Sequence, residues 1–310
     1  MTKPDIAHLI SQATARLSQA GIATPRVDAE LLAAHVAHID RGELQAAILS
    51  GRELIFDAEH FDALVSERSR RVPLQHLVGY APFRSLMLAV GPGVFIPRPE
   101  TEQVAQYAID AVHGRLKPQD NSTRPQMLVD LCSGSGAIAF ALVTEVPNSI
   151  VHGVEFSTHA LAWAEHNQRL LAHEYPAVLE NLTFHQDDAT RALPELEGQV
   201  DVVVSNPPYI PPDQVPIEHE VREHDPEIAL YGRGTDGLTV PRGVLNRAAK
   251  LLRPDGEFFM EHAETQAQAV RDMARSSGMW RHVTTLPDLS GRDRMLYAVR
   301  TKDISGRVVT

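Results

Sequence analysis

The chain has 310 residues, of which 43% are hydrophobic, and a formal net charge of −11 at pH 7. This length suffices for one large or two modest domains, and no apolar run approaches the ~20 residues of a membrane helix. The negative charge argues against tight, sequence-independent binding to nucleic-acid phosphates. A single cysteine excludes an internal disulfide and fits a reducing cytoplasm. We therefore expect a cytoplasmic protein that binds neither nucleic acid nor membrane.

The N-terminal segment, residues 1–72, has the pattern of amphipathic helices. Thr24 followed by Pro25 is typical of a helix start, and Asp57 is suited to cap another helix. Apolar residues recur at helical spacing in the first of these segments: Ile6, Leu9, Ile10, Ala13 and Leu17. We expect a small helical domain here.

The next segment, residues 73–97, is punctuated by Gly and Pro and predicts an extended hairpin linker. From residue 98 to residue 310, strand and helix patterns alternate, which favours βαβ units around a mostly parallel sheet. Gly256–Glu261 and Arg294–Val299 predict two late strands. The expected fold class is therefore α/β, with a main domain over residues 98–310.

A turn of small residues lies between an apolar strand and a helix start within Met127–Ala139. Glycines at such a turn let the backbone approach a ligand closely. The turn comprises Cys132, Ser133, Gly134, Ser135 and Gly136. By itself this is weak evidence for a binding site.

Acidic residues end the next two predicted strands. Ile150–Glu155 ends in a carboxylate that lies about 20 residues after the turn, the spacing at which an acid binds ribose hydroxyls in the dinucleotide fingerprint. Leu182–His185 leads to Asp187 and Asp188. Ligands bind at the carboxyl edge of open α/β sheets, so these groups are candidate ligand contacts.

A rigid polar turn, Asn206-Pro207-Pro208-Tyr209, follows the apolar strand Asp201–Ser205. The prolines fix the backbone, so the Asn206 side chain and the adjacent carbonyl become fixed hydrogen-bond acceptors. Two acceptors in one plane suit a planar NH2 group, and Tyr209 can lie over its flat face. Taken alone, the turn is equally consistent with a proline-rich strand end.

The order of these features resembles the class I S-adenosylmethionine-dependent methyltransferases. Four outer segments narrow the resemblance to the family that methylates the glutamine of peptide chain release factors: Pro73–Gly79, Phe95–Glu102, Asp225–Leu230 and Ser290–Arg294. The similarity extends from about Thr24 to Arg300. It implies a Rossmann-like sheet with helices on both faces, joined by a β-hairpin to an N-terminal helical domain that recognises class I release factors. The implied substrate is the glutamine of their Gly-Gly-Gln tip.

The resemblance also implies residue roles. Asn206, Pro207 and Tyr209 would be catalytic, and with Pro208 they would bind the substrate. The implied contacts of S-adenosylmethionine are Phe95, Cys132, Ser133, Gly134, Ser135, Gly136, Glu155, Asp188, Ala189 and Asn206. Two departures from the family pattern are Cys132, at the first glycine position of the turn, and Glu261-His262-Ala263, where an aliphatic residue and Gly usually follow Glu.

Several alternatives stay open. Fifteen histidines invite a metal hypothesis, but no Cys or His spacing matches a closed zinc site, so we expect no metal. A related family that methylates a glutamine of a large-subunit ribosomal protein shares the Asn-Pro-Pro-Tyr turn. A DNA adenine methyltransferase uses a similar turn but needs a target-recognition domain and basic surface. A non-catalytic scaffold of the same fold is the remaining alternative.

Overall fold

The computed structural model describes residues 5–115 and 124–302, and the chain forms two compact units. The first unit contains the helical segment up to Tyr80 together with Val90–Pro92 and Pro216–His224. The second contains Ala81–Ala89, Gly93–Val215 and the chain from Asp225 onward. The domain boundaries expected at residues 72 and 97 stay predictions.

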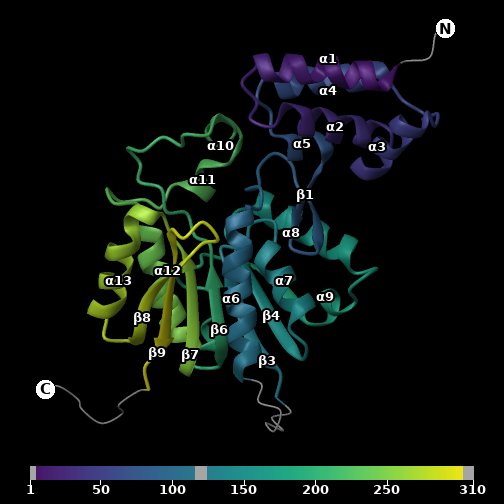
Figure 1. The fold of residues 1–310 in the computed structure, drawn as a ribbon. Coiled ribbons are helices and arrows are strands. Elements are labelled where there is room, and N and C mark those ends of the chain that lie inside the picture. The colour runs from purple at the N-terminus through teal and green to yellow at the C-terminus, as the bar shows by residue number, and fades with distance from the viewer. Residues whose placement is uncertain (1–4, 116–123, 303–310) are drawn as a thin grey trace, which may run out of the picture. The chain divides into compact units, whose positions relative to one another are not determined.

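The first unit is helical, as its sequence predicts (Figure 1). The side chains of Asp5, Asp40 and Asp57 accept backbone N–H groups at three helix starts, which satisfies donors that have no partner within the helix. The helices are α1 Ile6–Gln19, α2 Pro25–Val36, α3 Arg41–Ser50, α4 Ala58–Ser69 and α5 Leu74–Val78. Their apolar faces form a common core that includes Ile10, Leu17, Leu32, Leu44 and Phe61.

The expected extended linker is partly wrong. Its first residues form the short helix α5, which follows Pro73 and ends at Gly79 in the left-handed conformation, with φ 82°. A five-residue helix is too short for its periodicity to be recognised in the sequence. The hairpin itself is present, as β1 Tyr80–Phe83 and β2 Leu86–Ala89.

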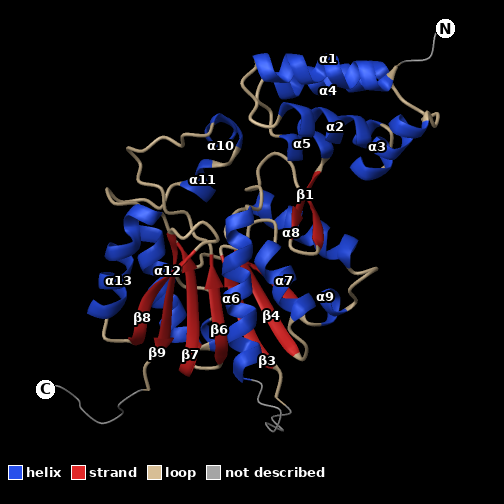
Figure 2. Ribbon diagram, in the orientation of Figure 1, coloured by secondary structure: helices blue, strands red, loops and turns tan. Residues whose placement is uncertain are grey.

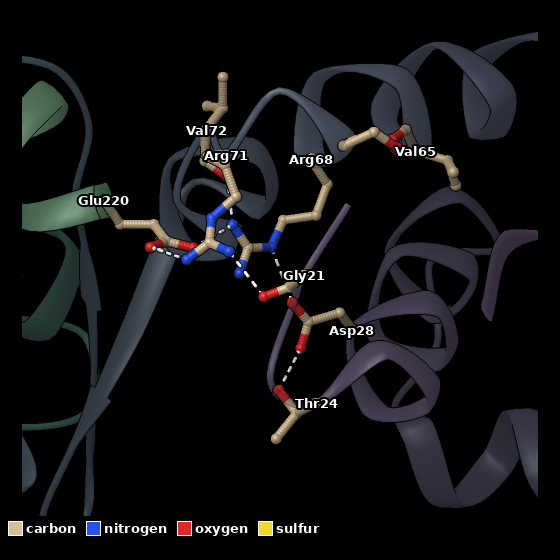
Figure 3. A network of polar contacts seen from close by, with 9 residues as sticks. Gly21, Thr24, Asp28, Val65, Arg68, Arg71, Val72 and Glu220 are labelled. Carbon is tan, nitrogen blue, oxygen red and sulfur yellow. Dashed lines mark hydrogen bonds and ion pairs between the residues drawn. The ribbon is translucent and has the colours of Figure 1, made fainter. Parts of the chain in front are cut away.

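An acidic segment from the second half of the chain completes the helical unit. Arg68 Nε donates to Asp28 Oδ2 at 2.7 Å, and Arg68 Nη1 donates to Glu220 Oε1 at 3.0 Å (Figure 3). Arg71 Nη2 donates to the other oxygen of Glu220 at 2.7 Å. Burial alone would raise the pKa of Glu220, but the two arginines outweigh it and lower the pKa to about 2. Residues 216–224 are therefore held to the helical unit by ion pairs.

The second unit is built on a seven-stranded sheet with the order β5-β4-β3-β6-β7-β9-β8 (Figure 2). Strands β3 to β7 pair in parallel, whereas β9 is antiparallel to both of its neighbours. The strands are β3 Gln126–Leu131, β4 Ser149–Glu155, β5 Leu182–Gln186, β6 Val200–Ser205, β7 Leu252–Glu261, β8 Trp280–Pro287 and β9 Asp293–Arg300. The mostly parallel sheet is confirmed, and β8 is a strand that the sequence analysis missed.

Helices cover both faces of this sheet, as predicted. Side chains alternate between the faces of a strand, so Val202 packs toward one core and Val203 toward the other. Helices α6 Pro99–Arg115 and α7 Ala137–Glu145 close the first core, and α12 Thr239–Leu251 and α13 Ala267–Ser276 close the second. The remaining α-helices are α8 Thr158–Leu171, α9 Ala177–Glu180, α10 His219–His224 and α11 Glu227–Leu230. Among the described residues, no helix has the length and apolar character needed to cross a membrane.

Candidate active site

The register of the parallel strands brings the candidate residues to one edge of the sheet. Ser205, the last residue of β6, pairs with Leu131 on one side and with Met260 on the other. The residues that follow, which include Asn206 and Glu261, therefore emerge next to one another. Glu155, at the end of β4, pairs with Gln186 at the end of β5. The four predicted strand ends thus share the carboxyl edge, where open α/β sheets bind ligands.

The small-residue turn joins β3 to α7 in a conformation that requires left-handed residues. Cys132, Gly134 and Gly136 have φ angles of 66°, 57° and 88°. Cys132 thus occupies a position that glycine adopts at no steric cost, which explains why the usual residue there is glycine. A side chain at Gly136 would lie 2.5 Å from the Phe140 ring, so packing also demands glycine there. Burial raises the pKa of the Cys132 thiol, which makes it a poor nucleophile.

The carboxylate of Glu155 accepts a hydrogen bond from the backbone of this turn. Its Oε2 accepts the backbone N–H of Gly134 at 2.8 Å, and its Oε1 accepts that of Ser157 at 2.7 Å. Burial raises the pKa of Glu155, and these hydrogen bonds only partly oppose the rise. The carboxylate still has lone-pair capacity for a further donor such as a ribose hydroxyl.

Asp188 and Ala189 follow β5 on the same edge. Asp188 Oδ1 accepts both the backbone N–H and the hydroxyl of Thr190, at 2.9 and 2.7 Å. Burial acts to raise the pKa of Asp188, but the hydrogen bonds from Thr190 outweigh it and lower the pKa. Asp188 is therefore a fixed, ionised acceptor.

One acidic residue of this edge was missed by the sequence analysis. Asp130 is fully buried in β3, and its Oδ2 accepts the backbone N–H of Ala139 at 3.2 Å. Its Oδ1 is buried without a hydrogen-bond partner among the described residues. Burial, with a smaller contribution from Glu155, raises the pKa of Asp130 to about 7. The available signal was an acid inside an apolar strand, two residues before the turn. An unpaired buried oxygen suits a ligand that carries a donor.

Asn167, a second residue that the sequence analysis did not single out, holds the small-residue turn by a hydrogen bond to its backbone. Asn167 of α8 is fully buried, and its amide Nδ2 donates to the carbonyl of Ser135 at 3.2 Å. The same side chain bonds both backbone groups of Ala89 in the hairpin, at 2.7 and 3.0 Å. Asn167 therefore ties the hairpin strand β2 to the turn, a link between distant segments that no local pattern signals.

The Asn-Pro-Pro-Tyr turn is held by a chain of buried and partly buried hydrogen bonds. Asn206 Nδ2 donates to Thr101 Oγ1 at 3.1 Å, and the Thr101 hydroxyl donates to Glu261 Oε2 at 2.8 Å. The Tyr209 hydroxyl donates to Glu261 Oε1 at 3.2 Å. One carboxylate thus supports both ends of the turn. Neither Thr101 nor Glu261 was among the predicted site residues.

The backbone of the same turn is packed by a glycine-rich segment. Gln266 Nε2 donates to the carbonyls of Tyr209 and Asp236, at 2.8 and 3.1 Å. A side chain at Gly232 would lie 2.7 Å from the carbonyl oxygen of Pro208. Close backbone packing therefore requires glycine at this position and holds the turn rigid.

Two of the outer motifs meet in the sheet unit. Arg98 Nη2 donates to Asp225 Oδ2 at 2.6 Å, which joins the Pro-Arg-Pro-Glu motif to the Asp-Pro-Glu motif. The Arg98 guanidinium also lies over the Phe95 ring, 5.1 Å from its centroid. The role of Phe95 toward a cofactor stays a prediction. In the described part of the chain, no group of three or more His, Cys, Asp or Glu side chains is arranged to hold a metal ion.

Comparison with known proteins identifies the family to which the chain belongs. The PrmC N-terminal domain family matches residues 8–79, and the methyltransferase domain family matches residues 125–304. A release factor glutamine methyltransferase of Bifidobacterium longum is 43% identical over 95% of this chain and 99% of its own length. The chain belongs to the release factor glutamine methyltransferase family. Its Streptomyces coelicolor relative of the same name is 45% identical over 93% of this chain and 96% of its own length.

A relative with a different printed activity is also similar over the full length. The 4-amino-L-phenylalanine/4-methylamino-L-phenylalanine methyltransferase of Streptomyces pristinaespiralis is 36% identical over 96% of this chain and 96% of its own length. Relatives of this chain therefore carry names that specify either a release factor glutamine or 4-amino-L-phenylalanine as the group that is methylated.

Proposed function

We propose that this chain transfers a methyl group from S-adenosylmethionine to the side-chain amide nitrogen of the glutamine in the Gly-Gly-Gln tip of class I release factors. The observation that carries the proposal is the orientation of the Asn206 amide. Its Nδ2 is engaged by Thr101, so its Oδ1 remains available to accept from a substrate NH2 group. The names of the Bifidobacterium and Streptomyces coelicolor relatives support a release factor as substrate.

The carboxyl edge of the sheet has groups that fit S-adenosylmethionine. Glu155 would bind the ribose hydroxyls, and Asp188 with Ala189 would contact the adenine. The unpaired Oδ1 of Asp130 would face the amino group of the methionine portion, beside the turn around Gly134. The cofactor supplies an electrophilic methyl group on its sulfonium.

The residues of the Asn-Pro-Pro-Tyr turn would make the substrate amide nitrogen, a poor nucleophile, more reactive by holding it in the correct orientation. An amide nitrogen shares its lone pair with the carbonyl, so orientation is the main difficulty. The Oδ1 of Asn206 and the backbone carbonyl of Pro207 would each accept one N–H of the substrate amide, and Tyr209 would pack on its flat face. Well-oriented groups reach effective molarities of about 10⁵–10⁸ M. As the N–C bond forms and the S–C bond of the sulfonium breaks, the two acceptors would stabilise the positive charge that develops on the nitrogen, which would then release one proton to water.

The helical unit would recognise the release factor away from the glutamine. Leu49 and Ile55 of this unit are 89% and 95% exposed, although both are large apolar residues. Replacing both by Ser should raise KM for the release factor and leave cofactor affinity unchanged. An unchanged KM would remove these two positions from the recognition surface.

The test uses a purified release factor, labelled cofactor and tandem mass spectrometry. The expected product carries one methyl group on the tip glutamine, and the Gln→Glu variant of the substrate should remain unlabelled because it offers no NH2 group. Asn206→Ala should lower transfer by at least about a hundredfold while leaving cofactor affinity nearly intact. Equal loss of both would mean that Asn206 mainly shapes the cofactor site.

The similarity to the Streptomyces pristinaespiralis protein favours one competing function. An aromatic amine presents a planar NH2 group to the same two acceptors, so 4-amino-L-phenylalanine belongs in the same assay. The ribosomal-protein glutamine is the other competing substrate. If 4-amino-L-phenylalanine or the ribosomal protein is labelled and the release factor is not, the proposed substrate is wrong. The proposed role of the Asn-Pro-Pro-Tyr turn would still hold.

A further inference from the structure

The direction of the hydrogen bonds around Glu261 determines which way the Asn206 amide points. An ionised carboxylate can only accept hydrogen bonds. The single hydroxyl proton of Thr101 is therefore committed to Glu261 Oε2, at 2.8 Å. The Thr101 oxygen that faces Asn206 can then only accept, so the neighbouring atom of Asn206 must be the NH2 group. The carbonyl Oδ1 is consequently directed away from Thr101.

The three residues of this relay come from separate elements. Thr101 lies in the first turn of α6, Glu261 is the last residue of β7, and Asn206 follows β6 (Figure 1). Both Thr101 and Glu261 are 5% exposed. Solvent therefore does not compete for the hydroxyl of Thr101, and the ionised Glu261 sets the direction in which that hydroxyl donates.

We propose that Thr101 and Glu261 are positioning residues that hold the Asn206 amide with its oxygen toward the substrate. They thereby select substrates that present an NH2 group. With the amide reversed, Asn206 would present its own NH2 to the substrate, and two donors would face each other. The inference rests on the proposed role of Asn206 as substrate acceptor. It also assigns a function to Glu261. The two residues that follow it, His262 and Ala263, are those that depart from the usual family pattern.

Glu261 must be ionised for this arrangement to hold. Burial raises the pKa of Glu261, whereas the hydrogen bonds from Thr101 and Tyr209 oppose the rise. The other charged groups that act on it are Arg294, which lowers the pKa, and Glu100, which raises it. A protonated Glu261 would become a donor, and the Thr101 hydroxyl would no longer be forced to point toward it. Turnover at saturating cofactor should therefore fall as the pH falls through this raised pKa.

The experiment compares Thr101→Val, which removes only the hydroxyl, with Thr101→Ser, which keeps it. We expect Thr101→Val to lower kcat for the release factor by about tenfold or more, because misplaced reacting groups can cost about a hundredfold. Thr101→Ser should recover most of this loss, and cofactor affinity should not change in either variant. Thr144→Val is the matched control, since the Thr144 hydroxyl donates to backbone carbonyls of Phe140 and Ala141 in α7. It should keep kcat within about twofold of the parent.

A further variant tests the same relay at its carboxylate. Glu261→Gln can both donate and accept, so kcat should fall and the acid limb of its pH profile should disappear. If Thr101→Val does not fold, this variant decides the question. Unchanged kcat in folded Thr101→Val or Glu261→Gln would overturn the proposal, and so would equal losses in Thr101→Val and Thr101→Ser. If Asn206→Ala is inactive while both variants stay active, the positioning role fails and the proposed function stands. No methylation of the release factor by the parent protein would refute the proposed function itself.

Discussion

Buried and half-buried carboxylates in the helical unit contact arginines, whereas those at the carboxyl edge of the sheet accept hydrogen bonds from neutral groups. In the helical unit, Arg68 bonds both Asp28 and Glu220. At the sheet edge, Asp130 and Glu155 accept backbone N–H groups, and Glu261 accepts two hydroxyls. The pKa of Glu220 is lowered to about 2, while that of Asp130 is raised to about 7.

This difference supports the proposal that Asp130 and Glu155 bind a ligand, whereas Asp28 and Glu220 stabilise the fold. A buried carboxylate with an arginine partner is compensated in the folded chain itself. A buried carboxylate without a cation is costly when ionised, and a ligand that brings donors or positive charge relieves that cost. This contrast supports the proposed site for a cationic cofactor at the sheet edge.

The buried ion pair of the helical unit should give the largest change in stability when its arginine is replaced. Arg68→Met leaves Asp28 buried without its partner and should lower the free energy of unfolding by about 3–5 kcal/mol. Arg70→Met is the matched control, because the Arg70–Glu67 pair is exposed and should contribute less than about 1 kcal/mol. Urea denaturation followed by circular dichroism measures both. Similar small losses in the two variants would mean that the buried arginine is not a structural partner.

Cofactor affinity tests the proposed role of Glu155 at the edge of the sheet. Glu155→Ala should weaken S-adenosylmethionine binding about ten- to a hundredfold, since a hydrogen bond to a charged group contributes about 1.5–3 kcal/mol. Glu220→Gln should leave the affinity unchanged while lowering stability. Calorimetric titration of both variants measures the contrast. If folded Glu155→Ala binds the cofactor as well as the parent does, Glu155 is not part of the cofactor site.

Substitutions in the turn after β3 should change the stability of the protein only slightly. Cys132 has φ 66°, so Cys132→Gly should relieve backbone strain and stabilise the protein by up to about 1 kcal/mol. Gly134→Ala is the opposite change, with φ 57° and no neighbouring atom within 4 Å of the added methyl. It should destabilise by about 1 kcal/mol from backbone strain alone. Thermal unfolding of the two variants should move in opposite directions, and shifts of the same sign would contradict this account.

Local sequence patterns predicted the sheet edge well because each strand end is signalled by its own neighbours. The apolar run before Asn206 and the run that ends in Glu155 each identify a strand, and parallel pairing then brings their ends together. The relay behind Asn206 could not be predicted in this way. Thr101 lies 105 residues before Asn206 in the chain, and Glu261 lies 52 residues after Tyr209.

The missed elements have similar physical reasons. Strand β8, Trp280–Pro287, lies at one edge of the sheet, and most of its residues are exposed or half-buried, so its apolar pattern is weak. Helix α5 is too short to show a period. Asp130 was overlooked because its strand was interpreted as apolar, although a buried acid in such a strand is itself a signal of function.

Proton release on cofactor binding tests most directly whether the carboxylates of the sheet edge await a ligand. Burial holds the pKa of Asp130 at about 7, so near pH 6.5 it is mostly protonated in the free protein. Binding of the cofactor's amino group favours the ionised form, so affinity should fall about tenfold from pH 8 to pH 6. Calorimetry in buffers of different ionisation enthalpy should detect proton release that disappears in Asp130→Asn and persists in Glu220→Gln. Identical proton linkage in the parent and Asp130→Asn would contradict the account.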